Sequence, residues 1–204
     1  MKLHFHYSSF QFSNCYVLAH EKSSDAIIVD PGSMDKHLLE YIESNDLNLK
    51  AVLVTHDHTG HVHGLRTLLR IYQVKIFAIN HSILDNKTIA VRDGDRIGIG
   101  PFTIEVISIP GHSADSVAYL IDSLLFTGDA LTAGLVGSTD SAYGAATQVN
   151  KLQGRLLSLP GDYTVLPGHG PPSTLEAERR YNAGISKYNE IQNRRPSFRM
   201  RLSF

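Results

Sequence analysis

The sequence lacks the features that mark secreted, membrane-spanning or nucleic-acid-binding proteins. Its 204 residues include a single cysteine, Cys15, so no internal disulfide can form. No apolar run is long enough to cross a bilayer, and residues 1–7 lack the apolar core of a signal peptide. The formal net charge of -1 gives no general attraction to nucleic acid or to an anionic membrane. We therefore expect a cytoplasmic protein with a small-molecule substrate and no nucleic-acid or membrane partner. The sequence is compatible with a homo-oligomer and does not decide the oligomeric state.

The composition is that of one ordinary globular domain. Hydrophobic residues make up 42% of the chain and charged residues 19%, and no repeat or linker divides it. A chain of this length can bury a core without disulfides. We predict a single domain over residues 1–204, in which residues 194–204 form a basic C-terminal tail with four arginines. This tail is expected to pack on its own fold or on a neighbouring subunit rather than to bind nucleic acid or a membrane.

Short runs rich in valine and isoleucine predict strands, and segments with helical spacing of apolar residues lie between them. Strands are expected at residues 15–19, 26–29, 51–54, 75–79, 102–109, 116–121, 124–126 and 164–166. Helices are expected at residues 34–42, 65–72, 146–159 and 173–182, the last opening with a capping-box pattern at Ser173. In an alternating first strand, His4 and His6 are predicted to face solvent. This order of elements favours a layered α/β architecture with sheets inside and helices outside.

The most informative segment is residues 55–64, which carries four of the eleven histidines within eight residues. It follows the apolar run at residues 51–54, so these histidines leave the end of a buried strand that holds them rigidly. His112, Asp129 and His169 follow other predicted strands in the same way. Imidazole and carboxylate groups are ligands of zinc and related metals. The pattern therefore predicts a metal site built at the ends of strands.

These motifs resemble those of the metallo-β-lactamase superfamily, whose signature is H-x-H-x-D-H followed by further His, Asp and His ligands. The resemblance extends from residues 14–18 and 29–32 to residues 167–171, which is nearly the whole chain. Within the superfamily it is most similar to the small glyoxalase-II-like hydrolases, through residues 93–97, 125–129, 138–140 and 159–162. The resemblance implies an α/β fold, the four-layer αββα sandwich, with the site at one edge of the two sheets.

Residue by residue, the resemblance implies two adjacent metal positions that share one aspartate. The residues carried over are His56, His58 and His112 for the first position, His61 and His169 for the second, and Asp129 for both. Zinc is the expected metal, with iron or manganese as alternatives.

One signature residue is missing, because Gly60 stands where the superfamily has an aspartate of the second position. His63, which replaces a glycine three residues later, is a poor substitute: on a helix it points about 200° away from His61. Asp57 lies between two inward-facing histidines and is expected to point away, toward a supporting or surface role. We therefore favour loss of one ligand over compensation. One ion would bind tightly, and a second would be weak or completed by water.

Three further residues are candidates for roles around the metal positions. Asp30 and Thr55 lie next to the ligand strands and are candidates to orient imidazoles from behind. An equally good interpretation is that both satisfy backbone groups at strand ends. Tyr143, in the loop at residues 137–145, is a candidate to contact substrate, and an ordinary loop tyrosine is at least as good an interpretation.

The activity that the resemblance implies is that of a metallo-hydrolase similar to hydroxyacylglutathione hydrolase. A metal-bound hydroxide would cleave a thioester, ester or lactone of a small metabolite, with Asp129 as the catalytic carboxylate. Two alternatives stay open. One is a mononuclear non-haem iron sulfur dioxygenase of the persulfide dioxygenase type, with iron held by His56, His112 and Asp129. The other is a degenerate, non-catalytic metal-binding protein.

The Gly60 hypothesis predicts how many ions the protein holds. After dialysis against metal-free buffer, elemental analysis should find one tightly held ion per chain. The Gly60→Asp variant restores a carboxylate, which should raise the count to two. Two tightly held ions in the unchanged protein would contradict the hypothesis, and so would an unchanged count in the variant.

Overall fold

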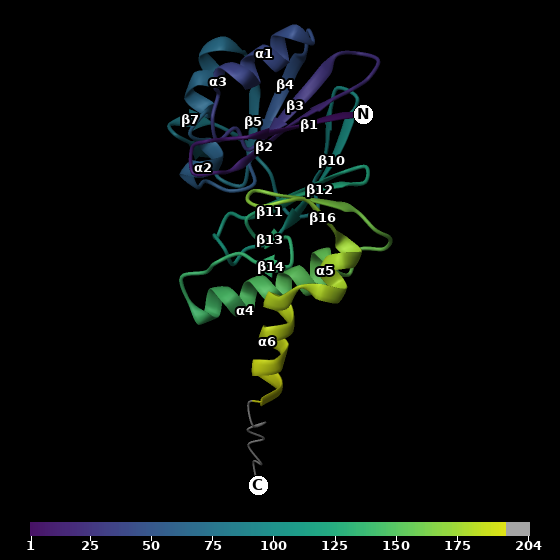
Figure 1. Ribbon diagram of the computed structural model, residues 1–204. Coiled ribbons are helices and arrows are strands. Elements are labelled where there is room, and N and C mark those ends of the chain that lie inside the picture. Colours follow the sequence, from purple (N-terminus) through teal and green to yellow (C-terminus); the bar gives the residue numbers. More distant parts are fainter. Residues whose placement is uncertain (195–204) are drawn as a thin grey trace.

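The computed structural model describes residues 1–194, which form two six-stranded sheets packed face to face with helices on the outside (Figure 1). The strand order is β1-β2-β3-β4-β5-β8 in the first sheet and β16-β15-β12-β11-β10-β9 in the second. In Figure 1, α1 and α3 lie at one end of the molecule and α4 and α5 at the other, with the strands between them. The predicted α/β sandwich of the αββα type is confirmed.

The first sheet contains the N-terminal strands. They are β1 (Lys2–Tyr7), β2 (Asn14–Ala19), β3 (Asp25–Val29), β4 (Asn48–Leu53), β5 (Lys75–Ala78) and β8 (Ile89–Ala90). Strands β3, β4, β5 and β8 are parallel, and helices α1 (Lys36–Ser44) and α3 (Leu65–Ile71) cover the outer face. Alternate strand residues such as Val17 and Val52 pack there against Leu38 and Leu68.

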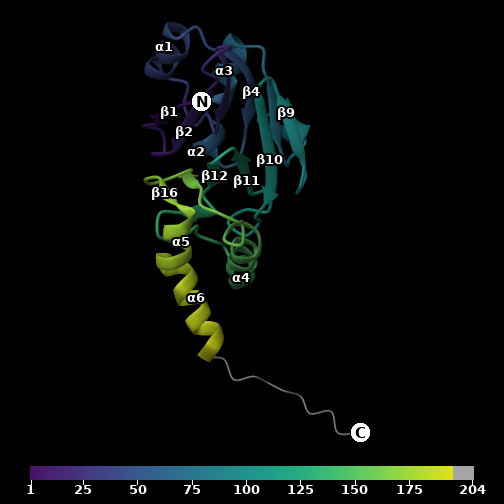
Figure 2. The same cartoon turned by 90° about the vertical axis from the view of Figure 1, so that its right-hand side faces the viewer.

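The second sheet contains the C-terminal strands. They are β9 (Arg96–Ile99), β10 (Phe102–Ser108), β11 (Val117–Ile121), β12 (Leu124–Gly128), β15 (Thr164–Pro167) and β16 (Ser173–Thr174). Its outer face is covered by α4 (Ala142–Lys151), by the π-helical turn Leu152–Leu156 and by α5 (Leu175–Tyr181). Helix α6 (Ala183–Arg194) extends away from this layer (Figure 2).

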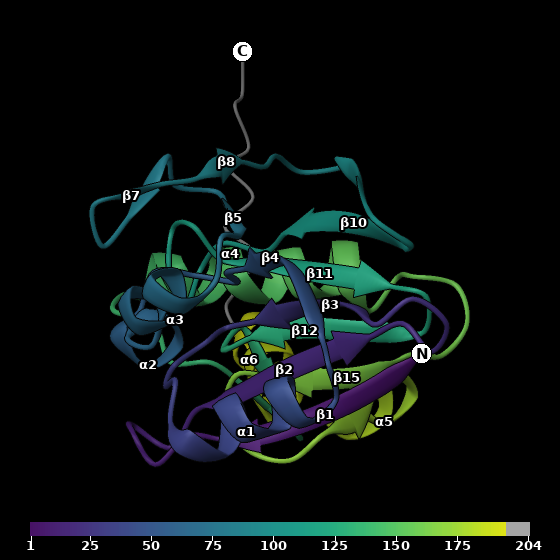
Figure 3. The same cartoon turned by 90° about the horizontal axis from the view of Figure 1, so that it is seen from above.

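Five short elements complete the described chain. They are α2 (Thr59–Val62) and the strands of two small hairpins, β6 (Ser82–Ile83), β7 (Asn86–Lys87), β13 (Leu131–Thr132) and β14 (Leu135–Val136). The view in Figure 3 shows α2 and α3 beside the first sheet. No helix among residues 1–194 combines the length and apolar character that a membrane span requires. The predicted basic tail lies outside the described residues, except for Arg194 at the end of α6.

A single apolar layer joins the two sheets. Tyr16 and Leu53 of the first sheet pack in one buried cluster with Ile104, Tyr119 and Phe126 of the second. The strands alternate in the expected way: the neighbours of Tyr16 and Leu53 belong to the outer cluster of the first sheet, and Ala118 and Leu125 belong to that of the second. Burial of this layer is the main favourable term that holds the sandwich together.

The predicted strands are all present, and the predicted helices shift at their ends. The helix expected at residues 146–159 begins at Ala142, because the Ser141 side chain accepts a hydrogen bond from the Gly144 N–H and caps it. The helix expected at residues 173–182 begins at Leu175, capped by Thr174, since Ser173 pairs with Val165 in the sheet. The helix expected at residues 34–42 runs from Lys36 to Ser44.

The prediction that His4 and His6 face solvent is wrong. His6 is 8% exposed, with Nε2 2.9 Å from the Asp35 carboxylate, and the His4 ring stacks on Tyr41. Both histidines lie on the face of β1 that α1 covers, while Phe5 on the opposite face is exposed. The alternation correctly separates two faces of the strand, but it does not say which face a helix covers.

Tyr119 provides a test of the contact between the sheets. Its buried hydroxyl donates to the backbone oxygens of Val54 and Phe77, at 3.0 and 3.2 Å. Tyr119→Phe removes the donor and leaves a buried acceptor unpaired, so the free energy of unfolding should fall by about 1–3 kcal/mol in urea titrations. Tyr181→Phe changes a side chain that is 74% exposed and is the matched control. Equal stabilities of the two variants would contradict the assigned role of the hydroxyl.

Candidate metal centre

Polar side chains from both sheets meet at the ends of their strands. They are His56 and His58 after β4, His61 in α2, His112 after β10, Asp129 after β12 and His169 after β15. The fold thus brings together all the residues that were predicted as ligands, in a histidine-rich potential metal site.

The first group consists of His56, His58 and His112, whose ligand atoms all lie within 4.8 Å of one another. His58 Nδ1 and His112 Nε2 are 3.1 Å apart. His112 Nδ1 lies 2.8 Å from the backbone oxygen of Ser138, which can only accept, so Nδ1 carries the ring hydrogen. In a neutral ring the Nε2 lone pair of His112 therefore faces His58. A cation between the two rings would satisfy such an arrangement.

His56 adds a buried acceptor that has no partner. Its Nε2 is buried and makes no hydrogen bond to any described residue. Its Nδ1 lies 3.1 Å from the hydroxyl of Thr55, which itself donates to Asp30 at 2.6 Å, so Nδ1 is the protonated nitrogen. An unsatisfied buried acceptor costs about 1–3 kcal/mol. The lone pair of Nε2 points into the histidine cluster, and the residues present fit a bound metal ion.

Asp129 connects the first group to the other two histidines. Its Oδ2 lies 3.8 Å from Nε2 of both His56 and His112, and 3.2 Å from His61 Nε2. Its Oδ1 is 2.7 Å from His169 Nδ1. His56, His61 and Asp129 form a second group of ligand atoms within 4.8 Å of one another. Asp129 is therefore placed to serve two adjacent positions.

The buried carboxylate of Asp30 supports this arrangement from behind. It accepts hydrogen bonds from the Thr55 backbone N–H at 2.8 Å and from the Thr55 hydroxyl at 2.6 Å. His61 Nδ1 lies 3.0 Å from its Oδ2. Asp30 thus contacts one imidazole directly and reaches His56 through Thr55, and it also pairs with the Thr55 backbone N–H, so contacts of both expected kinds are present and the orienting role stays a prediction. In metal sites such partners set which ring nitrogen is free to bind.

Burial and neighbouring charges shift the pKa values of three residues of the centre in different directions. Burial and the charge of His61 lower the pKa of His56 to about 2, so this ring is neutral, the form that binds a metal. Burial also disfavours the charged form of His61, but the carboxylates of Asp30 and Asp129 outweigh it and raise its pKa to about 10. Burial favours the neutral acid of Asp129, but the bonds from His169 and His61 outweigh it and hold its pKa well below the usual range.

The two neighbours considered as substitutes for the missing aspartate lie elsewhere. Asp57 is exposed, and its backbone N–H donates to the Asp115 carboxylate at 2.9 Å. His63 is exposed and stacks on Phe10, with ring centroids 4.0 Å apart. Neither residue belongs to the groups of potential metal ligands among residues 1–194. Gly60 itself is buried in α2.

Gly168, next to His169, lies against the centre. A Cβ at this position would overlap His61 Cε1 and would lie 2.5 Å from Asp129 Oδ1. Only a glycine allows the backbone after β15 to approach the ligands so closely. The glycine in this Pro-Gly-His motif is therefore required because a side chain would overlap the ligands, and not only because the backbone turns there.

Tyr143 differs from its predicted setting. It lies in α4 rather than in a loop, and its side chain is 83% exposed. No hydrogen bond of the described chain joins it to the cluster, so its contact with a substrate stays a prediction.

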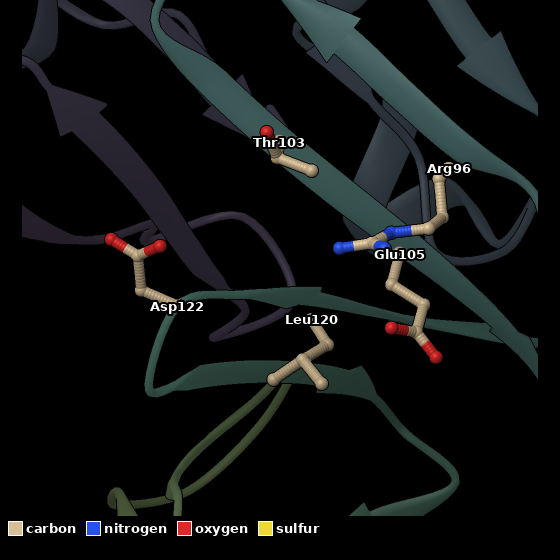
Figure 4. A pocket seen from close by; sticks show the side chains of 5 residues that line it. All are labelled: Arg96, Thr103, Glu105, Leu120 and Asp122. Carbon is tan, nitrogen blue, oxygen red and sulfur yellow. The ribbon is translucent and has the colours of Figure 1, made fainter.

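A separate pocket lies on the second sheet, away from the histidines. Its volume is about 180 Å³, and it is lined by Arg96, Thr103, Glu105, Leu120 and Asp122 (Figure 4). It opens on the face turned away from the first sheet, since the alternate residues Ile104 and Val106 belong to the layer between the sheets. It contains none of the converging side chains.

Two residues in contact with the cluster were not predicted from the sequence. Ser138 accepts from His112, as described above, and the backbone oxygen of Gln11 lies 3.0 Å from His169 Nε2. Both contacts are made by backbone oxygens, which every residue type possesses. Their side-chain types therefore give no signal of these contacts, although Ser138 opens one of the segments that carry the family resemblance.

The chain belongs to the metallo-β-lactamase superfamily. The family description "Metallo-beta-lactamase superfamily" matches residues 9–169, a span that contains all the converging side chains. The resemblance inferred from the sequence motifs is confirmed.

Two relatives show how far the similarity extends. A hydroxyacylglutathione hydrolase of Chromohalobacter salexigens is 33% identical over 164 residues, which cover 79% of this chain and 63% of the hydrolase. The chain therefore spans less than two thirds of that enzyme. A Mycobacterium tuberculosis protein named as uncharacterized is 31% identical over 203 residues, which cover 83% of this chain and 91% of the relative.

Solved structures of the same fold superpose closely. ETHE1 from Myxococcus xanthus has a TM-score of 0.83 and 26% identity, covering 95% of this chain and 91% of that chain. TTHA1623 in a di-iron-bound form has a TM-score of 0.76 and 27% identity, covering 88% and 98%. The B3 metallo-beta-lactamase BLEG-1, at 24% identity and a TM-score of 0.83, covers 91% and 100% and supports the fold alone.

The ionic contacts of His61 predict how its ring titrates in the metal-free protein. Its pKa is raised to about 10, above the ordinary 6.5, so the stability from its charged form is complete below pH 6.5 and is lost as the pH rises through about 10. NMR of the imidazole in chelator-treated protein should show this titration. Asp30→Asn should move it toward lower pH, and Asp85→Asn, on an exposed aspartate, should not. A His61 titration near pH 6.5 in the unchanged protein would contradict the assignment.

Proposed function

We propose that this chain is a metal-dependent hydrolase that cleaves a thioester, ester or lactone of a small metabolite. The observation that carries the proposal is the buried, unpartnered Nε2 of His56, which faces a cluster of imidazoles and one carboxylate. His56, His58, His112 and Asp129 would hold the first ion, and His61 and His169 with Asp129 would contribute to a second position. Membership of the superfamily supports this use of the cluster.

The exposure of the cluster is compatible with substrate access from one side. His56 and His61 are buried, whereas His58 is exposed and His169 is half-buried. A bound ion supplies a water of lowered pKa and polarises a carbonyl oxygen. The residues of the chain keep the ligand nitrogens unprotonated, through Thr55 for His56 and Ser138 for His112, and Asp129 accepts hydrogen bonds on the side of His61 and His169.

Thioesters are the first substrate class to examine. Relatives about 30% identical are named hydroxyacylglutathione hydrolase, the name of an enzyme that acts on a glutathione thioester. Because the chain spans 63% of one and 66% of another of these relatives, their whole activity comes to this chain only as a proposal. The metal is zinc in this proposal, with iron or manganese as alternatives.

A second candidate is a mononuclear iron dioxygenase that acts on a persulfide. His56 Nε2 and His112 Nε2 each lie 3.8 Å from Asp129 Oδ2, which gives two histidines and one carboxylate around a common point. Such a facial triad with open positions suits non-haem iron. The high structural similarity to ETHE1 from Myxococcus xanthus is the reason to test this activity beside hydrolysis.

Activity measurements with matched variants test the proposal. Zinc-loaded protein should cleave members of a thioester, ester and lactone panel without oxygen, and Asp129→Asn should lower kcat/KM by at least about 100-fold, as loss of a key electrostatic group does. His112→Ala should lose the first ion as well, while His81→Ala, on an exposed histidine outside the cluster, should change neither property. Oxygen uptake with a persulfide by the iron form, and no anaerobic cleavage, would replace hydrolysis by the second candidate.

A further inference from the structure

The turn between β1 and β2 lies next to residues of the second metal position. Gln11 in this turn contacts His169 and lies beside Gly60. Its backbone oxygen lies 3.0 Å from His169 Nε2. Its side-chain oxygen Oε1 lies 2.9 Å from the point that a Cβ on Gly60 would occupy, and its own Cβ lies 3.5 Å from that point. The side chain of Gln11 is therefore in contact with the point at which a side chain at position 60 would begin.

Independent contacts hold the turn in this place. The Ser13 hydroxyl donates to the Gly60 backbone oxygen at 2.6 Å, and the Asn14 backbone N–H donates to the Gly168 oxygen at 2.7 Å. Ser13 and Asn14 are both buried. Gln11 adopts the left-handed backbone region, with φ of 53°, which non-glycine residues adopt rarely and at a cost. The turn is thus anchored to α2 on one side and to the segment after β15 on the other.

We propose that the side-chain oxygen of Gln11 replaces the missing signature carboxylate as a donor at the second metal position. This inference rests on the proposed metal-dependent function and adds a residue to its second site. Through its backbone oxygen the same residue orients His169, whose Nδ1 faces Asp129. The second position would then have donors from Gln11, His61, Asp129 and His169.

The chemistry of an amide oxygen determines the expected affinity. It is a neutral donor, whereas the carboxylate in the superfamily signature carries a charge, so the second ion is held less tightly than the first. Carbonyl oxygens suit manganese and other hard cations better than they suit soft metals. The second position should therefore also tolerate manganese.

Two substitutions at position 11 isolate the side chain, since both keep the backbone oxygen that contacts His169. Gln11→Asn shortens the side chain by one methylene and keeps a residue type that accepts a positive φ. Gln11→Glu keeps the length and adds a charge. Titration of metal-free protein with Zn²⁺ and Mn²⁺, followed by calorimetry and by elemental analysis at fixed free metal, measures both ions separately.

We expect the second-ion Kd to rise by at least about 10-fold in Gln11→Asn and to fall by a similar factor in Gln11→Glu, the size of change that altering a metal's immediate surroundings produces. The Kd of the first ion should stay within about 2-fold, a difference of less than about 0.5 kcal/mol. Ser9→Ala, on an exposed residue of the same turn, should change neither Kd. Equal second-ion affinity in the unchanged protein and in both Gln11 variants overturns the inference, and so does a chain that takes up only one ion at millimolar metal.

A variant at position 60 provides a second test of the Gln11 inference. A Cβ there meets only the far end of the Gln11 side chain at 2.9 Å, so Gly60→Asp can displace it. In the Gly60→Asp background, Gln11→Asn should leave the second-ion Kd unchanged, because aspartate has taken over the position. An undiminished effect of Gln11→Asn in that background overturns the inference. If the Gln11 variants leave the second-ion Kd unchanged while hydrolysis is retained, the Gln11 inference is rejected and the proposed function is not. If the protein binds no ion at all, the inference and the proposed function are both rejected.

Discussion

The arrangement of the centre depends on one buried carboxylate, that of Asp30. It is 2% exposed and its backbone adopts a positive φ of 51°. Burying a carboxylate is costly unless donors surround it, and here Thr55 supplies two hydrogen bonds and His61 a third contact. Because Thr55 in turn accepts from His56, this single acceptor leaves Nε2 of His56 free and also contacts Nδ1 of His61. These contacts hold the carboxylate in place although the backbone of Asp30 lies in the left-handed region.

The parts of the site that were predictable are those that depend on residue type and on strand ends. The histidines after β4 and the residues at 112, 129 and 169 were recognised because imidazole and carboxylate groups followed apolar runs. Parallel pairing of β3 with β4 and of β12 with β15 carries such segments to the same end of each sheet. The two sheets also face each other with these strand ends at the same edge, so the groups after the strands meet there.

Three other features could not be predicted from the sequence pattern, each for a physical reason. The orientation of β1 was assigned wrongly, because alternation alone cannot distinguish a face covered by α1 from a face open to solvent. The start of α4 was missed by four residues, since the cap at Ser141 is a local hydrogen bond rather than an apolar repeat. The place of Gln11 depends on the path of a turn with two positive φ angles, at Gln11 and Phe12, and on backbone oxygens that carry no sequence signature.

The origin of the converging groups has a consequence for how the protein unfolds. His56, His58 and His61 come from the half of the chain that builds the first sheet, whereas His112, Asp129 and His169 come from the half that builds the second. An ion bound among them is therefore a cross-link between two halves that otherwise adhere through an apolar layer. Its binding free energy adds to the cohesion of that layer, since separation of the halves dismantles the coordination sphere. The free energy of unfolding would then rise with the concentration of free metal, independently of turnover.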